Sequence, residues 1–133
     1  MADWVFRTID WDMEAQKNLL PAIDRDPLAS INTLKNDCQK GWCKLFGVFK
    51  NGNRAGSFVL RKEYNENVYE LVVVAGGGVV GVEGLKASFA FFRKEAEKIG
   101  ADYIRMHVVR SGLMKLLKND GYKEAERVYR TRV

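Results

Sequence analysis

A glycine-rich stretch, residues 76–84, is the part of this sequence best suited to hold a ligand. It joins an apolar, β-branched run, Leu71–Ala75, to a segment with helical periodicity, so it lies where a strand passes into a helix. A helix N-terminus presents unpaired N–H groups and the positive end of the helix dipole, and both favour a bound anion. Five glycines in nine residues would let the backbone approach such a ligand closely. The stretch is therefore a candidate phosphate cradle, but Glu83 would compete with an anion there and favours a plain structural turn.

The other polar side chains that could take part in chemistry are isolated from one another. Glu70 lies at the start of the apolar strand, where a solvated glutamate is equally expected. His107 is the single histidine of the chain, and its alternating, strand-like surroundings favour a half-buried structural role. Ser111 is placed to cap a helix. No nucleophile, base and orienting acid form a triad, so that mechanism is not indicated.

The two cysteines do not indicate a metal centre. Cys38 and Cys43 are separated by four residues, without a second pair and with only one histidine in the chain. An ordinary zinc site needs four such ligands, so we expect no metal. Buried or idle thiols in a reducing compartment are the preferred interpretation.

The charge balance is basic, with a net charge of +5. Lysines and arginines accumulate in the last third, which would suit a phosphate-bearing ligand or a nucleic acid. Glu124 and Glu126 interrupt this run, so a solvated basic surface is the preferred interpretation. A nucleic-acid-binding module is kept as an alternative, although no helix-turn-helix or stacking motif supports it.

The length and the apolar content predict one domain, residues 1–133. A chain of 133 residues with 47% hydrophobic residues can bury a core of its own. No apolar run approaches the roughly 20 residues that span a bilayer, and the N-terminus lacks the pattern of a signal peptide. We therefore expect a cytoplasmic protein without a membrane partner.

The N-terminal part of the sequence predicts one strand followed by two helices. Residues 4–9 have strand composition. Asp10 is placed to cap a helix that Pro21 ends. Asp26, followed by proline, marks a second helix start, and Gly41 marks its end. The apolar face of this second helix consists of Leu28, Ile31, Leu34 and Cys38.

The middle of the sequence predicts an antiparallel meander of three strands. Residues 42–50 and 54–61 form two of them, joined by a hairpin turn at residues 51–53. A polar turn at residues 64–67 then leads into the buried strand, residues 68–75, which we expect to stop at the first glycine of the glycine-rich stretch.

The C-terminal part predicts a helix between two parallel strands, then a short helix and a last strand. The first helix follows Gly81 and ends at Gly100, a left-handed cap. Residues 103–109 alternate like a strand, and a helical crossover suits parallel pairing. Residues 111–121 form the short helix and its closing glycine, and residues 123–133 the last strand. The face of the crossover helix expected on the sheet consists of Leu85, Phe89, Phe92, Ala96 and Ile99.

This order of elements resembles the GCN5-related N-acetyltransferase family over nearly the whole chain. The segments Ala96–Ala101 and Leu116–Tyr122, the latter ending in Gly-Tyr, resemble the corresponding helix ends of that family. The resemblance implies an α/β (α+β) fold with a mixed sheet of six to seven strands. The implied order is βααβββαβαβ, with helices on both faces of the sheet.

The resemblance implies acetyl-CoA as co-substrate, bound at the glycine-rich stretch. In the family a loop of the form Arg/Gln-x-x-Gly-x-Gly/Ala holds the pyrophosphate through backbone amides. The matching stretch here is Val80–Leu85, in which Val80 replaces the basic residue and Glu83 replaces a small one. The residues implied to contact the co-substrate are Val73, Val74, Gly78, Gly81, Val82, Gly84 and Lys86.

The resemblance also implies roles in catalysis. Glu70 matches the fourth-strand glutamate that often deprotonates the amine through water, and a backbone amide near Val73 or Val74 would polarise the thioester carbonyl. Leu117 stands where the family commonly has a proton-donating tyrosine. Water, Ser111 or Tyr122 would then protonate the departing thiolate.

The sequence thus predicts an acyl-CoA-dependent N-acyltransferase that transfers an acetyl group slowly to an amine. The first alternative is a catalytically inactive relative that binds a protein or another ligand. The degenerate loop favours this alternative. The acceptor, the oligomeric state and the binding of CoA itself are left open.

Overall fold

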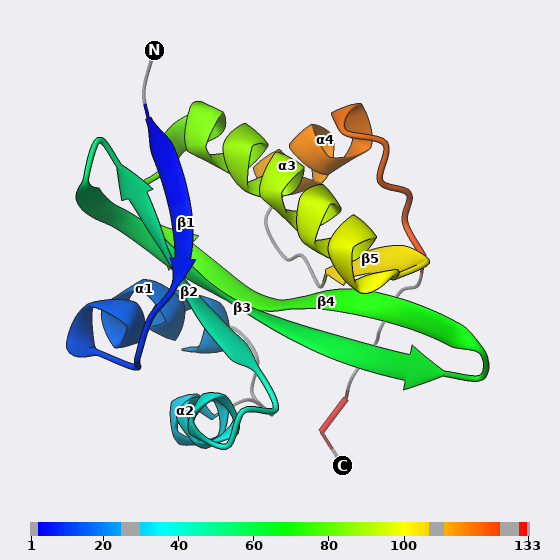
Figure 1. The fold of residues 1–133 in the computed structure, drawn as a ribbon, viewed down its shortest axis with the longest axis horizontal. Coiled ribbons are helices and arrows are strands. Elements are labelled where there is room, and N and C mark those ends of the chain that lie inside the picture. The colour runs from blue at the N-terminus through cyan, green and yellow to red at the C-terminus, as the bar shows by residue number, and fades with distance from the viewer. Residues whose placement is uncertain (1–2, 25–29, 107–110, 126–130, 133) are drawn as a thin grey trace.

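The computed structural model describes residues 3–24, 30–106, 111–125 and 131–132. One mixed sheet runs through these residues, with its strands in the order β1 to β5 (Figure 1). The first four strands pair antiparallel with their neighbours, and β5 pairs parallel to β4. The strands are β1 (Trp4–Thr8), β2 (Lys44–Lys50), β3 (Asn53–Asn65), β4 (Val68–Gly78) and β5 (Tyr103–Met106).

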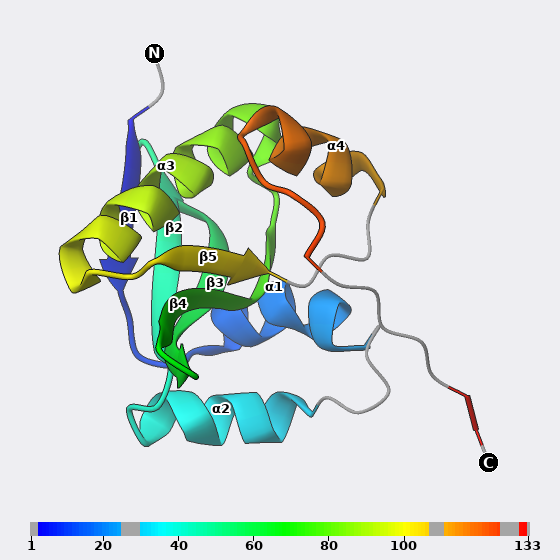
Figure 2. The same ribbon diagram turned by 90° about the vertical axis from the view of Figure 1, so that its right-hand side faces the viewer.

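Helices cover both faces of the sheet, as the sequence predicts. Figure 2 shows α1 and α2 on one face and α3 and α4 on the other. The helices are α1 (Met13–Asp24), α2 (Ile31–Gln39), α3 (Gly81–Ile99) and α4 (Ser111–Asn119). Within the described residues, no helix is long and apolar enough to cross a membrane.

A hydrophobic core lies under each pair of helices. The core under α3 and α4 contains Phe46, Val48, Phe58, Leu60, Leu71, Phe89, Phe92, Ala96 and Leu117. The core under α1 and α2 contains Ala15, Leu19, Leu34, Cys43, Leu45, Val59 and Ala75. Each fully buried large side chain contributes about 1.5–3 kcal/mol, so the two cores fix the sheet between its helices.

The first helix begins and ends later than predicted. Asp12, not Asp10, caps α1, because its Oδ1 accepts a hydrogen bond from the N–H of Ala15 at 2.8 Å. Pro21 does not end the helix, which continues to Asp24. Ala22 and Ile23 extend the apolar face against the core, and this packing outweighs the unfavourable proline.

The second helix begins after Ser30, its N-cap. The Oγ of Ser30 accepts a hydrogen bond from the N–H of Thr33 at 3.5 Å. The predicted start at Asp26 lies outside the described residues. Leu34 is buried and Cys38 packs against the same core, so this part of the predicted apolar face is confirmed. Cys38 and Cys43 are free thiols, and burial raises the pKa of Cys38 to about 11.

The meander is present. Strands β3 and β4 are longer than predicted, whereas β2 begins at Lys44 instead of residue 42. Asn51 and Gly52 form the tight turn between β2 and β3, both with positive φ. The second turn is confined to Glu66 and Asn67, because β3 continues to Asn65. This extension places Glu63 within the sheet, on the same strand as Arg61.

Strand β4 does not stop at Gly76 but continues to Gly78, pairing with β3 at Gly56, Ser57 and Phe58. The glycines there do not form a turn. At Gly77 the missing side chain allows close packing against α1. A Cβ atom at Gly77 would collide with the backbone carbonyl oxygen of Asn18 in α1. The absence of a side chain at residue 77 therefore lets α1 lie directly on the end of β4.

Gly77→Ala should lower the free energy of unfolding by about 1–3 kcal/mol, because α1 would have to move away from the sheet. Gly76→Ala is the matched control, since its Cβ would lie 3.4 Å from the Cβ of Phe58, an ordinary contact. We expect the control to change stability by less than about 0.5 kcal/mol. Urea denaturation checks both variants, and equal midpoints would contradict the close packing of α1.

The crossover from β4 through α3 to β5 is confirmed. The apolar face predicted for α3 contacts the sheet core, and Gly100 caps the helix with a φ of 74°. Residues 70–73 of β4 pair in parallel with Tyr103–Met106. The rest of the predicted strand, residues 107–109, lies outside the described residues.

The C-terminal prediction is only partly correct. Helix α4 has the predicted position and ends before Gly121, which has a φ of 90°. The predicted last strand is wrong for residues 123–125 and 131–132, which are not in a strand, while residues 126–130 lie outside the described part. The described sheet therefore has five strands instead of six to seven.

Candidate active site

A β-bulge interrupts β4 at Val74. In the pairing of β3 with β4, Val59 lies opposite Ala75 while Leu60 lies opposite Val73, so Val74 is the extra residue. Val73 packs toward the core under α3 and α4, whereas Val74 and Ala75 both pack toward the core under α1 and α2. The bulge thus breaks the alternation of side chains between the two faces of β4.

The bulge lies where the described pairing between β4 and β5 ends. The last parallel pair in the described residues is Val73 with Met106. A bulge takes backbone groups out of the regular ladder, and an amide freed in this way can donate to a carbonyl oxygen. Val73 and Val74, the two residues predicted to polarise a carbonyl, are both at this point.

Glu70 lies four residues before the bulge, on the face of the sheet that α1 and α2 cover farther along. Its side chain is 17% exposed. Four residues of extended strand span about 13 Å, so Glu70 could act on a group held at the bulge only through an intervening water. The structure therefore places the predicted base on the same strand and the same face as the bulge, without direct contact between them.

Glu70 belongs to a group of four charged side chains that we call the charge network: Arg61, Glu63, Glu70 and Arg105. Glu63 Oε2 lies 3.0 Å from Arg61 Nη2 and 2.9 Å from Arg105 Nη2. Arg105 Nε lies 3.3 Å from Glu70 Oε1. A hydrogen bond from Asn65, with further contributions from the two arginines, lowers the pKa of Glu63. The sequence did not indicate this network, because its members come from three strands.

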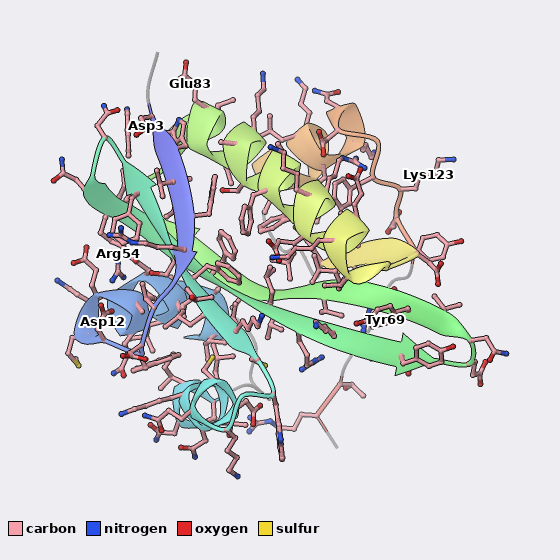
Figure 3. The ribbon with its side chains drawn as sticks, in the orientation of Figure 1. Asp3, Asp12, Arg54, Tyr69, Glu83 and Lys123 are labelled. Atoms are coloured by element: carbon pink, nitrogen blue, oxygen red, sulfur yellow. The ribbon has the colours of Figure 1, made fainter. Side chains whose placement is uncertain are left out.

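The start of α3 is an uncapped helix N-terminus. Val80 occupies the N-cap position and its side chain accepts no hydrogen bond. The first N–H groups of a helix have no acceptor within the helix, so those of Gly81, Val82 and Glu83 are available for an anion. Figure 3 shows the Glu83 side chain extending outward from the first turn of α3.

The predicted co-substrate residues differ in their access to this N-terminus. Gly78, Gly81, Val82 and Lys86 are exposed. Gly84 is buried: a Cβ there would lie 2.7 Å from the Trp4 ring, and its N–H donates to the Val80 carbonyl at 3.2 Å. Gly84 therefore has no free N–H for a ligand and instead lets α3 approach β1.

The candidate proton donors lie around α4. Ser111 is the first residue of α4, but its side chain and the whole of His107 lie outside the described part. Leu117 is buried in the core under α3 and α4. Tyr122 packs beside it, with its ring 6.1 Å from that of Phe89 and 5.5 Å from the guanidinium of Arg93.

The hydroxyl of Tyr122 is buried and has no hydrogen-bond partner among the described residues. Burial raises the pKa of Tyr122, which outweighs the opposing effect of the Arg93 charge. The phenol therefore keeps its proton at neutral pH, as a proton donor must.

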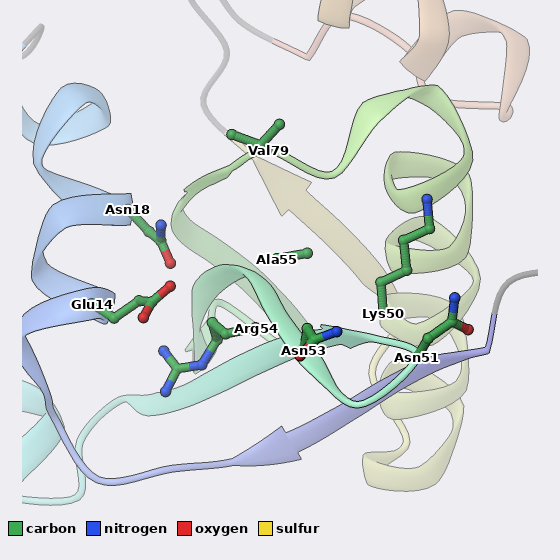
Figure 4. Close-up of a pocket in the computed structure, with 8 residues that line it drawn as sticks. All are labelled: Glu14, Asn18, Lys50, Asn51, Asn53, Arg54, Ala55 and Val79. Carbon is green, nitrogen blue, oxygen red and sulfur yellow. The ribbon is translucent and has the colours of Figure 1, made fainter.

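A polar pocket of about 410 Å³ lies away from these residues, between α1 and the β2–β3 hairpin. Figure 4 shows Glu14 and Asn18 of α1 facing Arg54. Arg54 pairs with Asp12 at 2.6 Å, and this hydrogen-bonded contact lowers the pKa of Asp12. Its Nη1 also donates to the Ser57 hydroxyl at 3.3 Å. No sequence pattern indicated this pocket. Its lining residues are Glu14, Asn18, Lys50, Asn51, Asn53, Arg54, Ala55 and Val79.

Neither this pocket nor a second one beside Arg54 includes the bulge, Glu70 or Tyr122. A chain of hydrogen bonds through Arg54, Ser57 and Asn18 ties the hairpin to α1.

Among the described residues, no group of three His, Cys, Asp or Glu side chains could hold a metal ion.

Comparison with known proteins identifies the fold. No family model and no curated protein matches the sequence. A ribosomal-protein-alanine N-acetyltransferase from Brucella melitensis biovar Abortus 2308 superposes with a TM-score of 0.72 at 13% identity, covering 98% of this chain and 99% of that one. An aminoglycoside N-acetyltransferase solved in complex with CoA superposes with a TM-score of 0.65 at 11% identity, covering 100% of this chain and 96% of that one.

The same fold also occurs in a protein described as a transcriptional regulator. A transcriptional regulator from Bacillus halodurans C-125 superposes with a TM-score of 0.72 at 8% identity, covering 98% of this chain and all of that one. At these identities the comparisons concern the architecture, because one fold can host several functions. The resemblance of this chain to the GCN5-related N-acetyltransferases is therefore confirmed at the level of the fold.

Proposed function

We propose that this protein is an N-acetyltransferase that transfers the acetyl group of acetyl-CoA to an amine. The observation that carries the proposal is the bulge at Val74, on the strand that leads to the uncapped N-terminus of α3. In this arrangement an amide at the bulge would bind the thioester carbonyl, and the helix N-terminus would bind a phosphate. The fold shared with N-acetyltransferases supports the same proposal.

The residues of the site fit the steps of the reaction. The amine nitrogen must lose a proton before it attacks the thioester carbon, and Glu70 would accept that proton through water. The amide at Val73 or Val74 would stabilise the oxyanion that forms. When the C–S bond breaks, the thiolate takes a proton, for which Tyr122 is the described donor candidate.

The co-substrate would be held by the backbone at the start of α3. The N–H groups of Gly81, Val82 and Glu83 suit a pyrophosphate, and Lys86 adds a positive charge one turn later. Calorimetric titration with CoA tests this binding, and thiol release from acetyl-CoA over a panel of amines tests the transfer. Absence of both heat and thiol release would overturn the proposal.

Glu83→Gln should tighten CoA binding by about 2- to 5-fold, because it removes a negative charge from the helix N-terminus. Glu97→Gln is the matched control: it removes the same charge near the C-terminus of α3, and Glu97 is likewise exposed. We expect the control to leave the Kd unchanged. Equal or weaker binding by Glu83→Gln would show that the pyrophosphate lies elsewhere.

An inactive binding protein is the second candidate function. It is favoured by the surface of the β4–α3 loop, where Val79 is 92% exposed and Val82 is 54% exposed. Val80 replaces the basic residue that the resemblance implies, so the loop is more apolar and less positive than a dedicated phosphate site. The calorimetric titration separates the two candidates, since a protein that does not bind CoA cannot use it.

A further inference from the structure

We propose that Arg105 is a positioning residue that holds the Glu70 carboxylate toward the bulge at Val74. This inference rests on the proposed function, because Arg105 would act on the amine only through Glu70. It adds a residue of β5 to the site, which neither the sequence nor the fold comparison indicated.

The register of the two parallel strands gives the direction of this effect. Glu70 lies opposite Tyr103, whereas Arg105 lies opposite Val72, two residues closer to the bulge. Glu70 Oε1 lies 3.3 Å from Nε, the guanidinium nitrogen nearest to the backbone of Arg105. The carboxylate is therefore drawn along β4 in the direction of Val74.

The rest of the charge network fixes Arg105 itself. Its Nη2 lies 2.9 Å from Glu63 Oε2, and Glu63 is held in turn by Arg61 on the same strand. The guanidinium is thus anchored on β3 by one nitrogen while another faces Glu70. A planar guanidinium anchored through Nη2 presents its Nε edge in a defined direction, which suits it to orient a second carboxylate.

Partial burial makes the contact with Glu70 more than a surface ion pair. The side chains of Arg105 and Glu70 are 24% and 17% exposed, so solvent screens them less than a fully exposed pair. A catalytic group that is displaced by about 1 Å can lose about 100-fold in rate. Loss of Arg105 should therefore appear in turnover and not in the binding of acetyl-CoA.

The test is a double-mutant cycle on kcat, with an amine that accepts the acetyl group. Arg105→Gln should lower kcat by about 100-fold and leave the KM for acetyl-CoA unchanged. Arg105→Lys should recover part of this loss, because it keeps the charge without the planar fork. In the Glu70→Gln background, Arg105→Gln should lower kcat by less than about 3-fold, because the group that it positions is absent.

Lys62→Gln is the matched control, since it removes a positive charge from an exposed position on the same strand, β3, outside the charge network. We expect its kcat to stay within about 2-fold of the unmodified protein. An equal loss from Arg105→Gln in both backgrounds, or no loss in either, would overturn the inference and leave the proposed activity intact. If the unmodified protein transfers no acetyl group to any amine, the proposed function itself fails and the inference fails with it.

Discussion

Glu70→Gln should lower kcat/KM for acetyl transfer by about 10²- to 10⁴-fold, the contribution typical of one positioned general base. The amide keeps the size of the side chain but cannot accept the proton of the amine. Glu70 is the carboxylate that shares a strand and a face with the bulge at Val74. The rate of thiol release from acetyl-CoA, measured as a function of amine concentration below saturation, gives the effect directly.

Glu66→Gln provides the control for this substitution. Glu66 is an exposed glutamate in the turn between β3 and β4, and its loss removes the same charge from the same hairpin. We expect its kcat/KM to stay within about 2-fold of the unmodified protein, as for an ordinary surface substitution. A Glu70→Gln variant as active as this control would mean that another group, or water alone, deprotonates the amine.

The parts of the fold that the sequence predicts well are those with a strong local signal. The change of period after Gly81 predicts α3, and Gly100 marks its end with a left-handed cap. Asn51 and Gly52 predict a tight hairpin because both accept a positive φ. In each case residues close in sequence determine the conformation.

The errors fall where distant residues determine the conformation. The glycines after Ala75 suggest a turn, but Gly77 remains in β4 because α1 packs against it. Pro21 suggests a helix end, but the apolar residues that follow it continue the packing of α1. Local propensity is outweighed by tertiary contacts in both segments.

The candidate site shows the same division. The resemblance points to Glu70 and to amides near Val74, but no residue type in the run Leu71–Ala75 marks a bulge. Only the pairing with β3 reveals that Val74 is the extra residue. The contact between Arg105 and Glu70 likewise depends on the register between β4 and β5. The residue types of either strand alone do not reveal this register.

Tyr122→Phe should lower kcat by about 10²- to 10⁴-fold if the Tyr122 hydroxyl protonates the departing thiolate. The position at which the family commonly has its acid is filled by Leu117, which is part of the core and has no proton to give. Tyr122 lies directly beside it, since its N–H donates to the Leu117 carbonyl at 3.0 Å. Tyr64→Phe, at an exposed tyrosine near the β3–β4 turn, is the matched control and should leave kcat unchanged.

Stability and pH separate a catalytic role of Tyr122 from a structural one. A buried hydroxyl without a partner costs about 1–3 kcal/mol, so Tyr122→Phe should unfold at the same or a higher temperature than the unmodified protein. Burial raises the pKa of Tyr122 above its ordinary value near 10, so the acid keeps its proton below pH 10 and loses it only at higher pH. A lower kcat together with unchanged or increased stability would therefore assign the proton donation to Tyr122. An unchanged kcat would assign the proton donation to water or to another group.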